Sequence, residues 1–261
     1  MERVSDTDAP FVDFGKTARD YAVHRPGFPP EFFNHVAELG IGIAGQRVVD
    51  LGTGTGTLAL GFTERGCAAV GIDPSAGMLR EAEGLARASK LDVRWVQAKA
   101  EDTGLGEGEF DVICAGQCWH WFDRARAARE AKRVLRIGGR ALIAYFSYLP
   151  SPGSLAEATE ELVLKHNPGW PMAGMDGRHP AWIEDLVGAG FGEITTFDFV
   201  LPIHFTHESW RGRFRACNGV LTLPAATLQA FDDDLMKLLA DRFPEPLAVE
   251  HRVYGIVAKK P

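Results

Sequence analysis

An acid and three glycines stand in one short turn, residues 50–56 (Asp-Leu-Gly-Thr-Gly-Thr-Gly). The preceding Val48 and Val49 are typical of a buried strand, and the apolar segment after the glycines is typical of a helix. Glycine lets the backbone adopt a positive φ and approach a ligand closely at no steric cost. A glycine turn between a first strand and a helix therefore predicts a nucleoside-cofactor site at the carboxyl end of that strand.

The spacing of the glycines separates two classes of cofactor. Dinucleotide sites use G-x-G-x-x-G, whose glycines serve the tight turn, the approach of a pyrophosphate and the packing of the helix. This chain has G-x-G-x-G instead, and Asp50 at the end of the strand would face a pyrophosphate poorly. A carboxylate there suits a cofactor with an amine or a positive centre. S-adenosylmethionine carries both an ammonium and a sulfonium group.

Acidic residues also follow the second and third predicted strands. Asp73 ends the second strand, and its carboxylate can accept both hydroxyls of a ribose in either class of cofactor. Pro74 then leads into a helix that carries Met78 in its first turn. Ala100 and Glu101 follow the third strand, where an adenine amino group would need an acceptor.

Five motifs in this order and spacing resemble class I S-adenosylmethionine-dependent methyltransferases. Besides the glycine turn, they are residues 71–75, 100–102, 110–113 and 133–139. With their strands they cover residues 47–148. The sequence departs from the family pattern at Ile137, where the family often has proline. The resemblance implies a Rossmann-like fold and S-adenosylmethionine as the cofactor.

Two further segments are similar to the small-molecule branch of this family, which includes trans-aconitate and other carboxylate methyltransferases. These are Tyr21-x-x-x-Arg25-Pro26 and residues 118–123 (Cys-Trp-His-Trp-Phe-Asp). The resemblance implies that Tyr21 and Arg25 close over the cofactor, with Arg25 available to its carboxylate. The alternative is that Tyr21 only packs and that Arg25 is solvated.

We therefore expect the cofactor to be bound mainly from the strand ends. Besides Tyr21 and Arg25, the predicted contacts are Asp50, Gly52, Thr53, Gly54, Gly56, Asp73, Pro74, Met78, Ala100, Glu101, Gln117, Cys118 and Trp119.

His120 is the candidate catalytic base. Methyl transfer from a sulfonium needs orientation, exclusion of water and, for some acceptors, deprotonation. His120 follows the fourth strand at the edge where the methyl group should emerge, and histidine ordinarily titrates near neutral pH. A carboxylate acceptor needs no base, whereas a phenol, enol or amine can need one. The alternative is that His120 forms local hydrogen bonds and shapes its loop.

The predicted substrate contacts are Trp121, Tyr145 and Arg211. Trp121 and its aromatic neighbours would form a wall that suits a flat acceptor, an adenine or a sulfonium. Arg211, Arg213 and Arg215 would share a face on a strand and would spread on a helix. A solvated charged face is the default interpretation of such a run. The alternative is that one of these arginines, represented by Arg211, binds an acceptor carboxylate.

Alternating strands and helices must position these residues, and they predict a mostly parallel sheet with helices on both faces. The predicted strands are residues 47–51, 69–73, 93–98, 110–115 and 140–148, and the helices are residues 31–39, 57–64, 76–88 and 124–135. Gly138 and Gly139 are expected to end the last of these helices and release the chain into the fifth strand.

Beyond residue 148 the pattern changes, since proline and glycine are frequent in residues 149–180. Helices are predicted at residues 155–166, 182–187 and 225–242, and strands at residues 195–205 and 252–258. We expect one domain, residues 1–261, with a doubly wound, Rossmann-like α/β fold. Its seven-stranded sheet is mostly parallel with an antiparallel edge strand. Residues 11–148 form the cofactor-binding core, and residues 149–180 and 206–245 form a helical cap that meets the substrate.

Charge and cysteine content restrict the partners. The 261 residues carry a net charge of −7 without a basic cluster, which disfavours a nucleic-acid partner. Four cysteines without a Cys-x-x-Cys pair are typical of reduced thiols in a cytoplasmic protein, and they predict no metal site. We expect no membrane span, because long apolar runs are absent from the sequence. The expected assembly is a monomer or a homodimer.

Taken together, the residues predict transfer of a methyl group from S-adenosylmethionine to a small organic acceptor. Oxygen of a carboxylate, hydroxyl or enol is the expected acceptor atom, because residues 115–118 (Ala-Gly-Gln-Cys) lack the Asp/Asn-Pro-Pro-Tyr type of N-methylation motif. The alternatives are an RNA or protein methyltransferase and a non-catalytic protein that binds S-adenosylmethionine.

Overall fold

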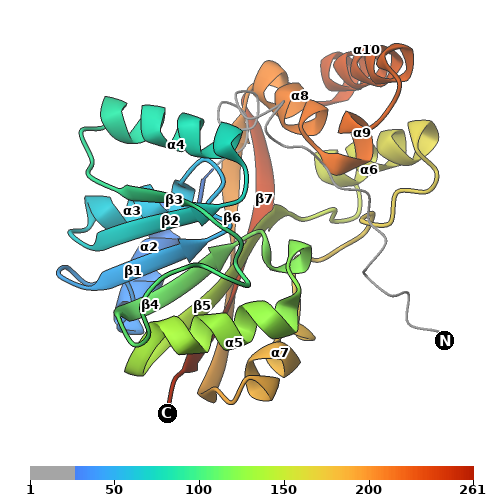
Figure 1. Cartoon of the computed structure of the whole chain (residues 1–261). Helices are drawn as coiled ribbons and strands as arrows, with labels where there is room; N and C mark the ends of the chain where they lie inside the picture. Colours follow the sequence, from blue (N-terminus) through green and yellow to red (C-terminus); the bar gives the residue numbers. More distant parts are fainter. Residues whose placement is uncertain (1–26) are drawn as a thin grey trace.

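A seven-stranded sheet with the order β3-β2-β1-β4-β5-β7-β6 forms the centre of the molecule. The computed structural model describes residues 27–261 (Figure 1). The strands are β1 (Arg47–Leu51), β2 (Ala68–Asp73), β3 (Arg94–Gln97), β4 (Phe110–Gly116), β5 (Leu135–Tyr148), β6 (Gly192–Phe205) and β7 (Leu247–Lys259). The helices are α2 (Pro30–Glu38), α3 (Thr57–Glu64), α4 (Ala76–Ala88), the 3₁₀ helix η3 (Trp119–Trp121), α5 (Arg124–Val134), α6 (Leu155–His166), α7 (Trp182–Gly188), α8 (His207–Arg215), α9 (Asn218–Leu221) and α10 (Ala225–Arg242).

The strand directions confirm the predicted sheet. Strands β1 to β5 pair in parallel, whereas β7 runs antiparallel to both β5 and β6. The chain moves outward from β1 to β3 and then crosses to β4 on the other side of β1. In open α/β sheets this switch of direction leaves a crevice at the carboxyl ends of the two strands, where ligands bind. The crevice lies beside the glycine turn.

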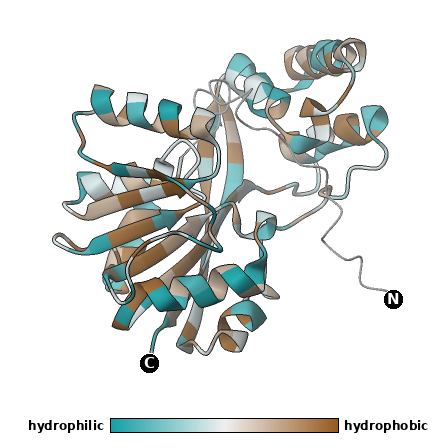
Figure 2. Cartoon of the chain, viewed as in Figure 1, coloured by the Kyte–Doolittle hydropathy of each residue, from teal (hydrophilic) through white to brown (hydrophobic). Residues whose placement is uncertain are grey.

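Each face of the sheet is covered by helices of a different composition. Helices α2 and α3 bring phenylalanines, among them Phe32 and Phe62, onto one face. Helix α5 brings alanines, including Ala127 and Ala131, onto the other face, where α7 also packs. Figure 2 shows apolar colouring on the central strands and hydrophilic stretches along α5. The burial of these apolar side chains is the main stabilising contribution to the packing of the helices on the two faces of the sheet.

Helices α6, α8, α9 and α10 form a cap at one end of the sheet (Figure 1). Its core contains the fully buried Trp210 and Phe214 of α8 and Phe231 and Leu235 of α10. The end of β5 and the paired ends of β6 and β7 also belong to this core, since Tyr148, Phe205 and Leu247 pack in it. The cap is therefore joined to the sheet through continuous strands as well as through loops.

One local expectation differs from the structure, and one alternative that the sequence left open is decided by it. Helix α5 ends at Val134, and strand β5 already begins at Leu135, so Gly138 and Gly139 lie inside the strand segment rather than before it. They occupy an irregularity in the β4–β5 pairing, where Gly138 has φ +76°. The arginine run after residue 206 is helical, because Thr206 caps α8 with a capping box.

Candidate active site

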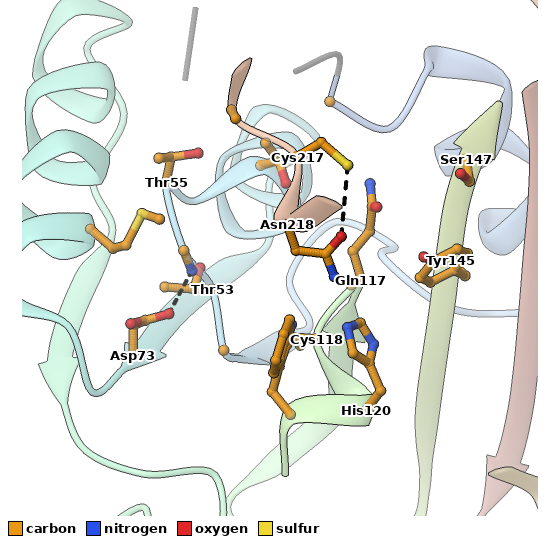
Figure 3. Close-up of a pocket in the computed structure, with 18 of the residues that line it drawn as sticks. Thr53, Thr55, Asp73, Gln117, Cys118, His120, Tyr145, Ser147, Cys217 and Asn218 are labelled. Carbon is orange, nitrogen blue, oxygen red and sulfur yellow. Dashed lines mark hydrogen bonds between the residues drawn. The ribbon is translucent and has the colours of Figure 1, made fainter. Parts of the chain in front are cut away.

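A cavity of about 810 Å³ opens at the carboxyl ends of β1, β2 and β4 and extends beneath the cap. Its lining comes from the glycine turn, the ends of β2, β4 and β5, the residues after β3, the segment 170–177 and the helices α8 and α9. Figure 3 shows residues of the glycine turn, the β4 end, β5 and α9 around one space. The cavity therefore joins the predicted cofactor side to the cap.

The glycine turn and Asp73 form one hydrogen-bonded unit. Gly52 and Gly54 have positive φ values of 62° and 56°, which favour glycine. The Gly54 amide donates to Oδ2 of Asp73 at 2.9 Å (Figure 3). The Ser75 amide donates to Oδ1 of Asp73 at 2.8 Å. Burial raises the pKa of Asp73, although these two hydrogen bonds oppose the shift. A carboxylate has about four lone-pair directions, so two remain for the hydroxyls of a ribose.

Asp50 lies beneath the turn, and this corrects the expected direct contact with the cofactor. It is 1% exposed and does not line the cavity. Its Oδ2 accepts hydrogen bonds from Thr53 Oγ1 at 2.6 Å and from the Ala59 amide at 3.2 Å. Desolvation raises the pKa of Asp50 to about 7. Asp50 therefore fixes the turn to the beginning of α3 from below.

Gly56 and Trp119 were also expected at the cofactor, but both pack elsewhere. A Cβ atom at Gly56 would lie 2.7 Å from the Trp95 ring, so this glycine permits close packing beneath the turn. Trp119 is 2% exposed, and its Nε1 donates to Asp185 of α7 at 2.9 Å. Neither residue lines the cavity. Glycine and tryptophan are both common in cofactor sites. Only the three-dimensional packing shows that these two residues point away from the cavity.

Other predicted cofactor residues do line the cavity; they are Gly52, Thr53, Gly54, Asp73, Pro74, Met78, Ala100, Glu101, Gln117 and Cys118. Ser75 caps α4 by accepting the Met78 amide, which places Met78 in the first turn beside Pro74. Oε1 of Glu101 accepts the Asp123 amide at 2.7 Å and thereby joins the β3 and β4 loops. The second carboxylate oxygen of Glu101 remains available to an amine.

The end of β4 is strained and closely packed. Gln117 has φ +64°, and its backbone N–H donates to the Ala144 carbonyl of β5 at 2.9 Å. Cys118 Sγ donates to the Leu51 carbonyl at 3.1 Å, and a Cβ at Gly52 would lie 2.9 Å from this sulfur. Burial raises the pKa of the Cys118 thiol well above its usual range, so the thiol stays protonated and is no nucleophile.

His120 lies on η3 and lines the cavity between the turn and β5. Its ring centroid lies 4.7 Å from that of Trp121, 6.3 Å from Tyr145 and 6.3 Å from Trp182. Trp121 and Tyr145, both predicted substrate residues, also line the cavity. Figure 3 shows the His120 and Tyr145 side chains on neighbouring sides of the space. The aromatic surroundings fix the direction of the His120 ring.

Arg211, the third predicted substrate residue, does not line the cavity. Its guanidinium pairs with Asp232 of α10 and with Glu208, on the outer side of α8. Arg213 of the same helix lines the cavity instead. Arg211 and Arg213 were both candidates from the sequence. Only the position of α10 decides which of the two points into the cavity.

Further lining residues lie in the cap and in the segment before it. Trp170, Met172 and Met175 line the cavity. Residues that the sequence did not indicate for the site are Ser147, Tyr148, Glu160, Phe214, Ala216, Cys217 and Asn218. Their spacing follows no local motif, because three separate segments of the chain contribute them. Tyr21 and Arg25 lie outside the described residues.

Among residues 27–261, no three His, Cys, Asp or Glu side chains are grouped so that they could hold a metal ion. Within the same part of the chain, every helix is too short or too polar to cross a membrane.

Residues 49–143 match the family described as "Methyltransferase domain". An uncharacterized methyltransferase of Mycobacterium tuberculosis is 37% identical over 129 residues, covering 49% of this chain and 50% of the relative. The demethylmenaquinone methyltransferase of Thermobifida fusca is 39% identical over 111 residues, covering 41% and 46%. The chain thus spans about half the length of these curated relatives.

Solved structures share the fold over a longer part of the chain. The crystal structure of YcgJ from Bacillus subtilis aligns with a TM-score of 0.58 and 21% identity, covering 88% of this chain and 99% of that one. The family match assigns a methyltransferase domain to residues 49–143, and the aligned structure shows that the fold around it is shared. S-adenosylmethionine is the cofactor of this domain. The matches do not confirm the trans-aconitate-like branch.

Proposed function

We propose that this protein transfers a methyl group from S-adenosylmethionine to an oxygen atom of a small organic acceptor. The observation that carries the proposal is one continuous cavity, which runs from the glycine turn past His120 and Tyr145 to the cap. Its volume of about 810 Å³ falls within the usual range for small-molecule sites. A cavity of this form suits a cofactor at one end and a small acceptor at the other.

Residues at the glycine turn fit S-adenosylmethionine. Asp73 keeps lone pairs for two ribose hydroxyls while it holds the turn through the Gly54 amide. Met78 and Ala100 offer apolar surface to an adenine, and Glu101 offers a carboxylate oxygen to its amine. The bound cofactor supplies a methyl carbon on a sulfonium, whose carbon–sulfur bonding pair stays with the neutral thioether of S-adenosylhomocysteine.

His120 and Tyr145 would then orient the acceptor oxygen toward that methyl carbon. For a hydroxyl or enol acceptor, an oxygen lone pair forms the new carbon–oxygen bond, and the released proton goes to His120. A carboxylate acceptor would be methylated without this proton transfer. The aromatic walls of Trp121 and Phe122 would exclude water from the same space.

Names of relatives also raise carbon as the acceptor atom. One relative is named a ubiquinone/menaquinone biosynthesis C-methyltransferase from Dinoroseobacter shibae, with 36% identity over 115 residues, or 42% of this chain. The acceptor atom therefore has to be identified by experiment. The decisive observation is the chemical environment of the transferred methyl group.

The first experiment follows a labelled methyl group. We would incubate the protein with ¹³C-methyl S-adenosylmethionine and a metabolite extract, then analyse products by mass spectrometry and NMR. The expected result is a labelled small molecule whose methyl carbon has the chemical shift of a methoxy group or methyl ester. A C-methyl shift would contradict oxygen transfer. Label in RNA or protein, or binding without transfer, would contradict the small-acceptor proposal altogether.

A variant of His120 tests the base. We expect His120→Ala to lower kcat by about 100-fold for a hydroxyl or enol acceptor, the usual contribution of a positioned base. Its affinity for S-adenosylhomocysteine, measured by calorimetry, should stay unchanged. The control is His204→Ala, because His204 is exposed on β6 and outside the cavity. Turnover of His120→Ala close to wild type at saturating acceptor would contradict a role as base.

A further inference from the structure

The cap end of the cavity combines one buried cation with apolar walls. Arg213 is only 8% exposed, and its guanidinium carbon lies 5.1 Å from the centroid of the Tyr148 ring. Trp170, Met172 and Phe214 line the same part of the cavity. A guanidinium stacked on an aromatic ring keeps its N–H groups in the plane at its edge, where they can bind a planar anion by two hydrogen bonds.

The three arginines of helix α8 point in two different directions. Residues four apart share a face of a helix, so Arg211 and Arg215 lie together and Arg213 points about 200° away from Arg211. Arg211 and Arg215 both pair with Asp232 of α10 and with Glu208. These pairs hold the outer face of α8 against α10 and direct Arg213 toward the cavity.

Glu160 is the acidic residue at this end of the cavity, and its carboxylate forms hydrogen bonds with neighbouring lining segments. Its Oε2 accepts the Gly174 amide at 2.7 Å, and its carboxyl group also accepts a hydrogen bond from the Tyr148 hydroxyl. These bonds join α6 to the segment that carries Met172 and Met175. The acid is thus used to position Tyr148, on which Arg213 stacks.

The charges of the lining separate the two ends of the cavity. Among the described lining residues, Lys99 and Arg213 carry the fixed positive charges, and Lys99 lies after β3 on the cofactor side. Arg213 is therefore the cation that an acceptor meets beneath the cap. A guanidinium forms strong, charge-assisted hydrogen bonds with an anion where burial reduces the competition from water.

We propose that Arg213 binds a carboxylate or phosphate of the methyl acceptor, at a point remote from the methylated atom. Tyr145 lies near His120, and Tyr148 lies beneath the Arg213 guanidinium. The two tyrosines are three residues apart on β5, which separates them by about 10 Å along an extended strand. The acceptor is thus an elongated, partly apolar organic anion. This inference rests on the proposed function, because it assumes that the cap side holds the acceptor.

Binding of simple anions tests the inference without turnover. The protein would be saturated with S-adenosylhomocysteine and titrated by NMR with phenylacetate, phenyl phosphate and the neutral phenylacetamide. We expect one of the two anions to bind at least about tenfold more tightly than the amide, as for charge-assisted hydrogen bonds. The better of the two identifies carboxylate or phosphate as the preferred group. Equal binding of all three probes, or no binding of either anion, would overturn the proposal.

Variants of α8 locate the anion site. Arg213→Gln should lose at least about tenfold in affinity for the preferred anion, and Arg213→Lys should regain part of it without the bidentate geometry. Arg242→Gln is the matched control, and its anion affinity should change less than about twofold, because Arg242 is exposed at the end of α10 and lies outside the cavity. Anion binding unchanged in Arg213→Gln would overturn the proposal.

The same samples separate this inference from the proposed function. Affinity for S-adenosylhomocysteine and the circular dichroism spectrum show whether each variant is folded and binds cofactor. If the wild type binds S-adenosylhomocysteine and transfers methyl groups but Arg213→Gln keeps its anion affinity, only the anion site is wrong. If the anion binds through Arg213 but no methyl transfer occurs with any acceptor, the proposed function is wrong while the anion site stands.

Discussion

The two ends of the cavity are built by different means. On the cofactor side, backbone groups form the surface: glycines with positive φ make the turn, and carboxylates such as Asp73 accept backbone amides. On the cap side, side chains form the surface, and aromatic packing around Trp210 and ion pairs to Asp232 hold the helices together. A backbone surface depends on few residue types, whereas a side-chain surface can change with every substitution.

The difference shows where each specificity resides. A cofactor shared by a large family can be bound by a turn that local sequence dictates. An acceptor that differs between proteins must be recognised by side chains that other parts of the chain position. Four predictions test this division between the two ends of the cavity, beginning with the largest expected effect.

Trp210→Ala should affect the cap most strongly. Trp210 is fully buried, and its Nε1 donates to Thr159 Oγ1 at 3.1 Å. Loss of a buried tryptophan costs about 3–5 kcal/mol of stability. We expect faster hydrogen exchange of the amides in α8 and α10, with β1 and β4 still protected and S-adenosylhomocysteine still bound. Met236→Ala, at a half-exposed position on α10, should change little. Equally faster exchange in β1 would show that cap and sheet unfold together.

Asp50→Asn should change the pH dependence of stability on the cofactor side. The pKa of Asp50 is raised from 3.8 to about 7, so the folded state keeps its proton where the unfolded state has lost it. Stability due to this group is therefore full below about pH 4 and falls as pH rises toward 7, by up to about 4 kcal/mol.

The asparagine variant should lack that decrease, as urea unfolding at about pH 5 and about pH 7 will show. The exposed Asp92 provides the control variant Asp92→Asn. If stability depends on pH in Asp50→Asn as it does in the wild type, Asp50 ionises in the folded protein at the same pH as in the unfolded chain.

Asp73→Ala tests the predicted contact between the Asp73 carboxylate and the ribose hydroxyls of the cofactor. Removing two charge-assisted hydrogen bonds should weaken S-adenosylhomocysteine binding about 100-fold. Calorimetry measures this affinity, and binding of phenylacetate or phenyl phosphate should persist if the cap end is independent. Asp92→Ala again serves as a control for an exposed carboxylate. A loss below about threefold would remove Asp73 from the cofactor contacts.

Gly54→Ala and Gly56→Ala compare two glycines with positive φ in the same turn. A Cβ at Gly54 meets no atom within 4 Å, whereas a Cβ at Gly56 meets Trp95 at 2.7 Å. We expect Gly54→Ala to cost about 1 kcal/mol of stability and Gly56→Ala about 2 kcal/mol or more. Thermal unfolding measures both, and Trp95→Leu should reduce the Gly56→Ala cost specifically. Equal costs with and without Trp95 would contradict the packing role.

Most of the sheet could be predicted from sequence, because its signals are local. Residues 57–64 and 76–88 were predicted as helices with the bounds that α3 and α4 have, since glycine and Ser75 mark their starts. The start of β5 was predicted too late, because Gly138 and Gly139 resemble a helix end although they accommodate a strand irregularity. The order of motifs likewise predicted which end of the cavity would bind the cofactor.

The cap could be predicted only in part. Periodic leucines were enough for α10, but the direction of each side chain depends on which helices meet. Arg211 and Arg213 look alike in sequence, and Asp232, far along the chain, decides that Arg211 faces outward. Trp119 looks like a site residue, and only Asp185 on α7 reveals why it is buried. Such choices are made by tertiary contacts that no local pattern contains.

The long strands at the edge of the sheet have a kinetic consequence. β6 and β7 pair from Gly192 and Lys259 to Phe205 and Leu247, so one ladder spans both the sheet and the core of the cap. A hinge between cap and sheet would have to break this ladder. Among the described residues, the segment 170–177 and the helices α8 and α9 line the cap side, so the entry of an acceptor and the departure of its product would depend on their local movement. That movement, rather than a domain rotation, would set the upper limit of the turnover rate.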